Sequence, residues 1–263
     1  MNIGTIVLAT SDDIQFLYTL IDQSLIFSSQ VVISFGSHFY NNEPENEDVI
    51  TELEQKYENK VSVVRYNIHK DSVLDSSVSP DNYWHCHGRW IAINKLKPDI
   101  EYVFLLDADE IPDGEDILNW LKMTPYKTYD CVKFANYLYH REAICRSKRI
   151  EDSIVFIKKE HLDTPYLTMQ TLERTATYDL CPGNKRRRVL SHSTSLHPWS
   201  PMFHHYSWVR TYKQMLRKVR SWGHKRDLDW ESLVDDEFKN RTHKMFGPYE
   251  IVDNIFNISL KDN

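Results

Sequence analysis

Tyr102-Val103-Phe104-Leu105-Leu106-Asp107-Ala108-Asp109-Glu110 is the most informative stretch of this chain. Its first five residues are apolar or aromatic, which is typical of a central strand covered on both faces. Side chains alternate along a strand, so Asp107 and Asp109 are expected to face the same side. Two carboxylates this close repel each other unless a cation lies between them. The stretch therefore predicts a core strand whose carboxyl end holds a cation.

The expected cation is Mn²⁺ or Mg²⁺. Hard oxygen ligands suit these ions, and proteins commonly hold them with one or two carboxylates together with substrate phosphates. We therefore predict a site for a metal ion and a diphosphate at Asp107 and Asp109. The alternative is that Asp107 only begins an acidic turn before a helix over Gly114–Lys122.

Bulk composition narrows the class of protein only slightly. The chain has 263 residues, a net charge of −6 and charged and apolar fractions of 27% and 41%, which fit a globular protein with a substantial core. The net charge gives no argument for nucleic-acid binding. No apolar run approaches the roughly 18–20 residues of a membrane span, and Met1–Thr10 lacks the basic region of a signal peptide. With four widely spaced cysteines, we expect a cytoplasmic protein with reduced thiols.

The first 125 residues alternate between strands and helices. We expect strands at Ile3–Thr10, Gln30–Phe35 and Val61–Tyr66, and helices over residues 14–25, Val49–Tyr57 and Tyr83–Leu96. This alternation predicts an α/β fold with a mostly parallel central sheet and helices on both faces. Ligands bind such sheets at the carboxyl ends of the strands. The polar segments Thr10–Asp13, Gly36–His38 and Asp107–Asp109 are therefore expected to meet at one edge.

From Tyr126 onward the pattern changes to short strand-like pieces at Asp130–Tyr139, Ser153–Lys158 and Arg187–Ser191. No Gly/Ser-rich linker separates this half from the first. We therefore predict a single domain over residues 1–263, in which residues 126–263 form a cap on the half formed by residues 1–125.

Two adjacent histidines, His204 and His205, lie between apolar residues downstream. A neutral imidazole is a suitable further ligand for a divalent ion. If the segment is extended, the two side chains face opposite sides and only one can be a ligand. The alternative is a hydrogen-bonded histidine of the core.

The segment after the histidines is expected to be a helix with two faces. A buried stripe is predicted at Trp208, Tyr212, Met215, Val219 and Trp222. Basic residues recur on another face at Arg210, Lys213, Arg217, Arg220 and His224. This face is either solvated or a cationic wall beside a diphosphate. The cluster Lys185–Arg188 has the same two interpretations.

Arg89 lies near the start of the helix that precedes the aspartate strand. A guanidinium group at such a position can bind two phosphate oxygens at once. We therefore include Arg89 among the expected ligands of the diphosphate.

Together these features resemble a glycosyltransferase of the GT-A fold, of the broad family 2-like group. The resemblance covers most of the chain and is carried by the first strand and helix, Gly88-Arg89, Leu105-Leu106-Asp107-Ala108-Asp109-Glu110 and His204-His205-Tyr206-Ser207-Trp208-Val209-Arg210 with its basic helix. It implies a Rossmann-like GT-A sheet, with residues 1–125 as the nucleotide-sugar-binding half and residues 126–263 as the acceptor-binding half.

The resemblance also implies roles for particular residues. Asp109 would bind Mn²⁺ or Mg²⁺ directly, Asp107 would contact the donor ribose or a water on the metal, and His205 would be the later metal ligand. Thr10 and Asp12 would line the nucleoside pocket. Two features depart from the family: Ser34–His38 lacks an acidic residue for the nucleoside, and the usual Glu-Asp pair that supplies a catalytic base is not evident.

The predicted reaction is transfer of a sugar from a nucleoside-diphosphate sugar to a hydroxyl of a glycan or other acceptor, with inversion at the anomeric carbon. Inversion needs a carboxylate within hydrogen-bond reach of the acceptor hydroxyl. Glu173 is the first candidate because it lies between the aspartate motif and the histidines, and Asp152 and Glu142 are the next.

Two other functions remain open. One is a metal-dependent nucleotidyltransferase, which no glycine-rich phosphate loop supports. The other is a non-catalytic protein that binds an anionic polymer through Lys185–Arg188 and the basic helix. The sequence leaves the oligomeric state, the donor sugar and the nucleobase undetermined.

Overall fold

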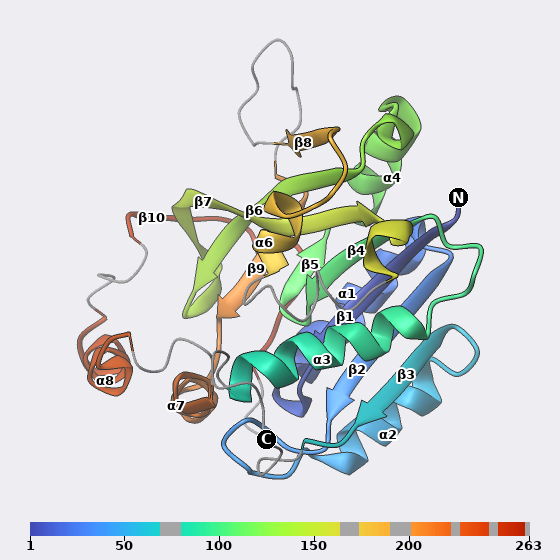
Figure 1. The fold of residues 1–263 in the computed structure, drawn as a ribbon. Helices are drawn as coiled ribbons and strands as arrows, with labels where there is room; N and C mark the ends of the chain where they lie inside the picture. The colour runs from blue at the N-terminus through green and yellow to red at the C-terminus, as the bar shows by residue number, and fades with distance from the viewer. Residues whose placement is uncertain (69–79, 164–173, 190–200, 222–226, 242–246, 261–263) are drawn as a thin grey trace.

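The computed structural model describes residues 1–68, 80–163, 174–189, 201–221, 227–241 and 247–260 of the chain. In these residues ten strands form one sheet, in which strands from both halves of the chain lie side by side (Figure 1). None of the described helices is long and apolar enough to cross a bilayer.

The first part of the sheet is parallel and runs in the order β3-β2-β1-β4. These strands are β1 (Ile3–Ala9), β2 (Gln30–Gly36), β3 (Val61–Tyr66) and β4 (Tyr102–Asp107). Every residue of β1 and β2 is buried, as expected of strands covered on both faces. The α/β fold predicted from the alternation of strands and helices is confirmed.

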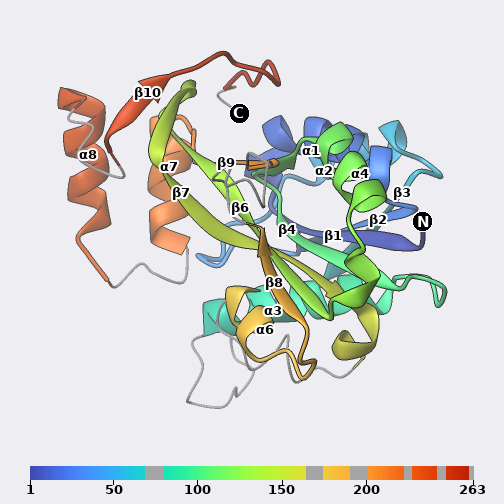
Figure 2. The ribbon, with the colours of Figure 1, turned by 90° about the horizontal axis from the view of Figure 1, so that it is seen from above.

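Helices cover both faces of this sheet (Figure 2). One face carries α1 (Ile14–Phe27), α2 (Glu47–Lys56) and α4 (Gly114–Met123), and the other carries α3 (Pro80–Asn94) and α6 (Arg174–Asp179). The predicted start of the first helix holds, because η1 (Ser11–Asp13) leads into α1. There the Asp13 carboxylate accepts hydrogen bonds from the amide and hydroxyl groups of Thr10, at 3.0 and 2.7 Å.

The second part of the sheet is mixed and continues in the order β4-β7-β6-β9-β5. Its strands are β5 (Glu110–Pro112), β6 (Cys131–His140), β7 (Glu142–Lys158) and β9 (Phe203–Trp208), with β8 (Arg186–Val189) beside β6 and β10 (Tyr249–Ile251) beside β7. Strand β7 is antiparallel to both β4 and β6. The short helix η2 (Tyr126–Thr128) precedes β6, and η3 (Lys159–Leu162) follows β7.

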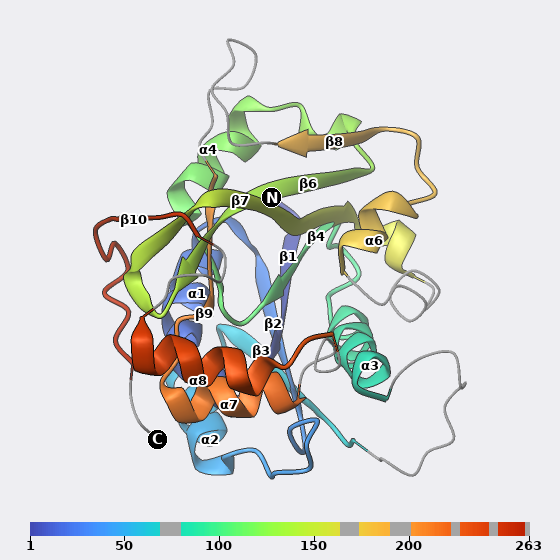
Figure 3. The same ribbon diagram turned by 90° about the vertical axis from the view of Figure 1, so that its left-hand side faces the viewer.

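Two further helices pack against each other, namely α7 (Tyr212–Ser221) and α8 (Trp230–Asn240) (Figure 3). Their contact is apolar and includes Met215, Val219 and Val234, which are all buried. Arg217 and Lys218 of α7 face a cavity instead.

Two predicted elements differ from the structure. Strand β7 begins at Glu142, whereas the sequence predicted a strand only from Ser153, because the first half of β7 is polar and only partly buried. The predicted buried stripe is confirmed at Met215 and Val219 of α7, but not at its start. Trp208 ends strand β9, and Tyr212 is 43% exposed. Trp222 and His224 lie outside the described residues.

Candidate functional site

A cavity of about 420 Å³ lies at the carboxyl ends of β1, β2 and β4. The three polar segments that the sequence placed at this edge all line it, through Thr10, Asp12 and Asp13, through Gly36 and His38, and through Asp107, Ala108 and Asp109. Their predicted convergence is confirmed. The volume falls in the range typical of small-ligand sites, about 300–1,000 Å³.

Asp107 is the last residue of β4, and its carboxylate is held by an arginine. Asp107 Oδ1 accepts a hydrogen bond of 2.8 Å from Arg89 Nη2, and the His85 ring lies 3.9 Å from the same oxygen. Arg89 is only 5% exposed and does not line the cavity. The sequence predicted that Arg89 contacts a phosphate, but the structure places this side chain outside the cavity. Arg89 instead orients the carboxylate that lines the cavity.

Asp109 is buried among three cationic groups. Its Oδ2 lies 2.8 Å from Arg210 Nη2 and 3.2 Å from Lys218 Nζ, and its Oδ1 lies 3.4 Å from His205 Nε2. Burial alone would raise the pKa of Asp109, but Lys218, His205 and Arg210 outweigh it and hold the pKa well below its ordinary value.

The two aspartates consequently have different partners. Strand β4 ends at Asp107, and Ala108 and Asp109 form a turn, so the alternation expected of a longer strand does not apply to them. Both carboxylates line the cavity, and a cation shared between them stays a prediction. Asp107 pairs with Arg89, whereas Asp109 faces Arg210, Lys218 and His205.

The two histidines face opposite sides of strand β9, as predicted. His204 is buried and hydrogen-bonded to the Tyr139 hydroxyl at 2.8 Å, and burial lowers its pKa to about 3. His204 is therefore a hydrogen-bonded histidine of the core, which was the alternative to a metal ligand in the sequence analysis. His205 lines the cavity, with its Nδ1 3.0 Å from Glu151 Oε2. Burial would lower the pKa of His205, but hydrogen bonds with Asp109 and Glu151 raise it to about 10.

Asp109 and His205 fit a divalent ion as a carboxylate–imidazole pair. Ligand atoms at about 2.1 Å from one ion lie roughly 3 Å apart when they occupy neighbouring octahedral positions. The 3.4 Å between Asp109 Oδ1 and His205 Nε2 is close to this spacing. The pair of oxygen and imidazole donors suits Mn²⁺ or Mg²⁺ with phosphate oxygens as further ligands.

Basic residues in and before α7 connect this helix to the acidic loops of the cavity. Arg210 Nη2 lies 2.7 Å from Asp13 Oδ1, and Arg217 contacts Asp12 at 2.7 Å and Glu43 at 2.9 Å. Of the two interpretations of the basic face, the cationic wall fits Arg210 and Arg217.

Lys213 and Arg220, the other described residues of the predicted basic face, do not line the cavity. Arg220 pairs instead with Glu231, where both side chains are about half exposed. Lys218 completes the wall, but the predicted face did not include it.

Glu45 is an acidic residue of the cavity that the sequence analysis missed. It lies in the loop after β2, is 6% exposed, and accepts a hydrogen bond of 2.7 Å from the Ser11 amide. Burial raises its pKa to about 7. Glu45 thus places an acidic residue at the cavity a few residues after Ser34–His38, and no local pattern in the polar loop marks it.

Replacing Glu45 with glutamine is expected to remove a pH dependence of stability. In the folded state the pKa of Glu45 is raised from 4.5 to about 7. Its stabilising contribution to the free energy of unfolding is therefore complete below about pH 4.5 and is lost as the pH rises through about 7. Glutamine retains the acceptor for Ser11 and does not titrate. The free energy of unfolding of the variant relative to the wild type should rise by on the order of 3 kcal/mol over that range. Urea unfolding across the pH series measures it, and a constant difference would contradict the assignment.

Of the three carboxylates predicted as the catalytic base, the two that the structure describes do not line the cavity. Glu173 lies outside the described residues. Asp152 pairs with Lys133 at 3.4 Å and Arg188 at 3.6 Å and does not line the cavity. Glu142 lies at the exposed start of β7, 3.4 Å from Arg241.

The neighbours of Asp152 on β7, Glu151 and Ser153, do line the cavity. Side chains alternate along a strand, so Asp152 faces away from the cavity that its neighbours face. The adjacent acids Glu151 and Asp152 mark this segment in the sequence. The sequence analysis did not predict the part of β7 that carries them.

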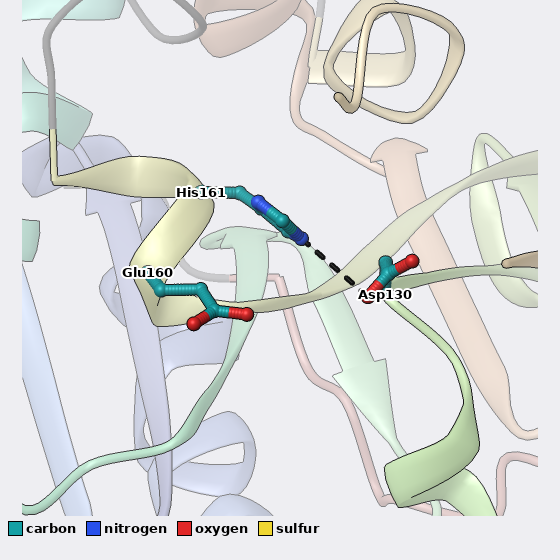
Figure 4. Close-up of side chains that lie close together, drawn as sticks. All are labelled: Asp130, Glu160 and His161. Atoms are coloured by element: carbon teal, nitrogen blue, oxygen red, sulfur yellow. Dashed lines mark ion pairs between the residues drawn. The ribbon is translucent and has the colours of Figure 1, made fainter. Parts of the chain in front are cut away.

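A second group of candidate ligands lies away from the cavity and consists of Asp130, Glu160 and His161 (Figure 4). Asp130 and His161 point toward each other, with 3.6 Å between Oδ1 and Nε2. The ammonium group of Lys158 lies 2.7 Å from the same Asp130 oxygen and 3.8 Å from Glu160. This group lies outside the cavity, and its side chains form an ion-pair cluster with Lys158.

The sequence matches no family model and no curated protein sequence. Solved structures similar to this chain include 4-diphosphocytidyl-2C-methyl-D-erythritol synthase from Anaerococcus prevotii DSM 20548, with 9% identity and a TM-score of 0.47 over 73% of this chain and 87% of that chain. TarS 1–349 from S. aureus is 13% identical, with a TM-score of 0.45 over 93% of this chain and 72% of that chain.

The glycosyltransferase GlyE from Streptococcus pneumoniae TIGR4 is 9% identical, with a TM-score of 0.41 over 90% of this chain and 63% of that chain. The α/β fold of this chain is assigned from its own strand order and helix placement, and its chemistry from the side chains of the cavity.

Proposed function

We propose that this chain is a metal-dependent glycosyltransferase that moves a sugar from a nucleoside-diphosphate sugar to an acceptor hydroxyl, with inversion at the anomeric carbon. One observation carries the proposal. At the carboxyl ends of the parallel strands, Asp107, Asp109 and His205 line the same cavity as the cationic side chains of Arg210, Arg217 and Lys218.

The charge of the cavity supports a requirement for a divalent cation. Among the described residues that line it, six carry carboxylates and three are arginine or lysine. The three cations are paired with Asp12, Asp13 and Asp109. A diphosphate entering this cavity adds negative charge, so a divalent ion at Asp109 and His205 is the group that favours its binding.

The aromatic residues of the cavity support binding of a nucleoside. Phe39, Tyr40 and Tyr66 line it and offer aromatic surfaces for a planar base. The guanidinium group of Arg217 lies 4.9 Å from the centre of the Phe39 ring. Asp107, held in place by Arg89, supplies carboxylate oxygens that can accept hydrogen bonds from ribose hydroxyls.

Departure of the nucleoside diphosphate would be assisted from the α7 side. Negative charge builds up on the leaving phosphate, and fixed cations in a partly buried site stabilise it without reorganisation. Arg210 is held by Asp13 and the Ser207 carbonyl, and Lys218 lines the same cavity. A bound divalent ion would act as a Lewis acid on the same phosphate oxygens.

Glu173 remains the first candidate for the base that accepts the proton of the acceptor hydroxyl. Replacing Glu173 with glutamine is expected to abolish transfer, by at least about 100-fold, while donor binding is unchanged. Comparing transfer rates with donor affinity from calorimetry checks this result. Glu142→Gln is the matched control, since Glu142 lies away from the cavity. Full transfer by the Glu173 variant would remove this residue from the mechanism.

A thermal-shift screen with nucleotides tests the function as a whole. A nucleoside diphosphate at about 100 times its dissociation constant, with Mn²⁺, should stabilise the protein by about 2.7 kcal/mol, which is a shift of several degrees. Stabilisation by nucleoside triphosphates with no response to diphosphates would favour a nucleotidyltransferase. Salt-sensitive binding of an anionic polymer, with no nucleotide response, would favour the non-catalytic function.

A further inference from the structure

A chain of hydrogen bonds leads from the aspartate motif into the second half of the sheet. Glu110 is fully buried, and its Oε2 accepts a hydrogen bond of 2.8 Å from the Asp107 amide. Its Oε1 lies 3.3 Å from the Ser153 hydroxyl, which is also 3.0 Å from Asn136 Oδ1. The third acid of the motif thus anchors the aspartate turn to β6 and β7.

The same chain continues to the histidine of the cavity. Asn136 Nδ2 donates to Glu151 Oε2 at 3.3 Å, and this oxygen lies 3.0 Å from His205 Nδ1. His205 Nε2 then faces Asp109 Oδ1 at 3.4 Å. The hydrogen bonds therefore close a ring from Asp107 to Asp109 through strands β5, β7, β6 and β9.

The orientation of the Asn136 amide is fixed by its neighbours. Asn136 is fully buried, and its Oδ1 accepts from the Ser153 backbone amide at 3.4 Å as well as facing the hydroxyl. A backbone N–H can only donate, so the atom facing it must be the amide oxygen. The NH₂ group is thereby directed at the carboxylate of Glu151.

We propose that Glu151, held by Asn136, is a positioning residue for His205. It keeps the N–H of the imidazole on Nδ1, so that Nε2 offers its lone pair to the metal ion. A neutral imidazole has one N–H and one lone pair, and a carboxylate at Nδ1 places the N–H there. With an ion bound between Nε2 and Asp109 Oδ1, the lone pair of Nε2 would be directed at that ion. Acceptors of this kind orient metal-binding histidines and raise their affinity for the ion. The inference rests on the metal site of the proposed function.

Binding of Mn²⁺ to the full chain tests the inference, with titration followed by electron paramagnetic resonance. Glu151→Ala is expected to lower the affinity for Mn²⁺ by about 10–100-fold. Glu151→Gln retains an acceptor oxygen and should lose less than the alanine variant. Asp152→Asn is the matched control, because Asp152 is the next residue on β7 and does not line the cavity; its affinity should stay within about twofold of the wild type.

The hyperfine coupling between bound Mn²⁺ and the imidazole nitrogen separates positioning from other roles. It should be present in the wild type and in Asp152→Asn, and weakened in Glu151→Ala. If the alanine variant matches Asp152→Asn in affinity and coupling, the inference is overturned. If both Glu151 variants lose affinity equally while the coupling persists, Glu151 is a direct ligand and the inference is also overturned. Absence of Mn²⁺ binding by the wild type would instead remove the proposed metal function itself.

Discussion

Asp109→Asn is expected to abolish metal-dependent turnover of the sugar nucleotide, with a loss of at least about 1,000-fold. The amide removes the negative charge that would hold the proposed divalent ion at Oδ1. It also removes the counter-charge of Arg210 and Lys218, which face Oδ2 at 2.8 and 3.2 Å. Release of nucleoside diphosphate from a panel of donors, with and without Mn²⁺, measures the effect.

The control for this variant is Asp99→Asn, which removes an exposed acid outside the cavity. It should turn over donor at the wild-type rate. Circular dichroism separates loss of the site from loss of the fold. A folded Asp109→Asn protein that keeps its metal-dependent turnover would show that the metal site is misplaced.

Arg210→Met is expected to cause the largest loss of stability among the variants considered. Arg210 is 5% exposed and binds Asp13 and Asp109 through the same Nη2 atom, at 2.7 and 2.8 Å. Methionine fills part of the volume but leaves two carboxylates without this partner. Removing one member of a buried ion pair costs about 3–5 kcal/mol, which for a chain of this length lowers the melting temperature by on the order of 10 °C.

The matched control is Arg220→Met in α7. Its pair with Glu231 is about half exposed on both sides, so its removal should cost no more than about 1 kcal/mol. Urea unfolding of both variants measures the difference. Equal losses in the two variants would mean that Arg210 is not the buried connection between α7 and the acidic loops.

The sequence predicted those parts of the fold whose signals are local. The apolar runs of β1, β2 and β4 identify buried strands, and in a parallel sheet their ends must meet at one edge. The opposite orientations of His204 and His205 also follow from strand geometry alone. For these elements neighbouring residues carry all the information required.

The parts that were missed depend on contacts between distant residues. The first half of β7 is polar and only partly buried, so hydrophobic periodicity does not reveal the strand. Asp109 and Lys218 are 109 positions apart, and no local pattern indicates their contact. Arg89 was assigned to the diphosphate from its place near the start of a predicted helix. Its burial behind Asp107 depends on how α3 packs, which no local pattern reveals. Glu45 lies in a polar loop whose path only the folded chain determines.

Anomalous diffraction from crystals soaked with Mn²⁺ and a nucleoside diphosphate tests the central claim most directly. The predicted result is a manganese peak within coordination distance of Asp109 Oδ1 and His205 Nε2, with the diphosphate bound to the same ion. A diphosphate bound in the cavity without an ion at these atoms, or a manganese peak only beside Asp130 and His161, would contradict it.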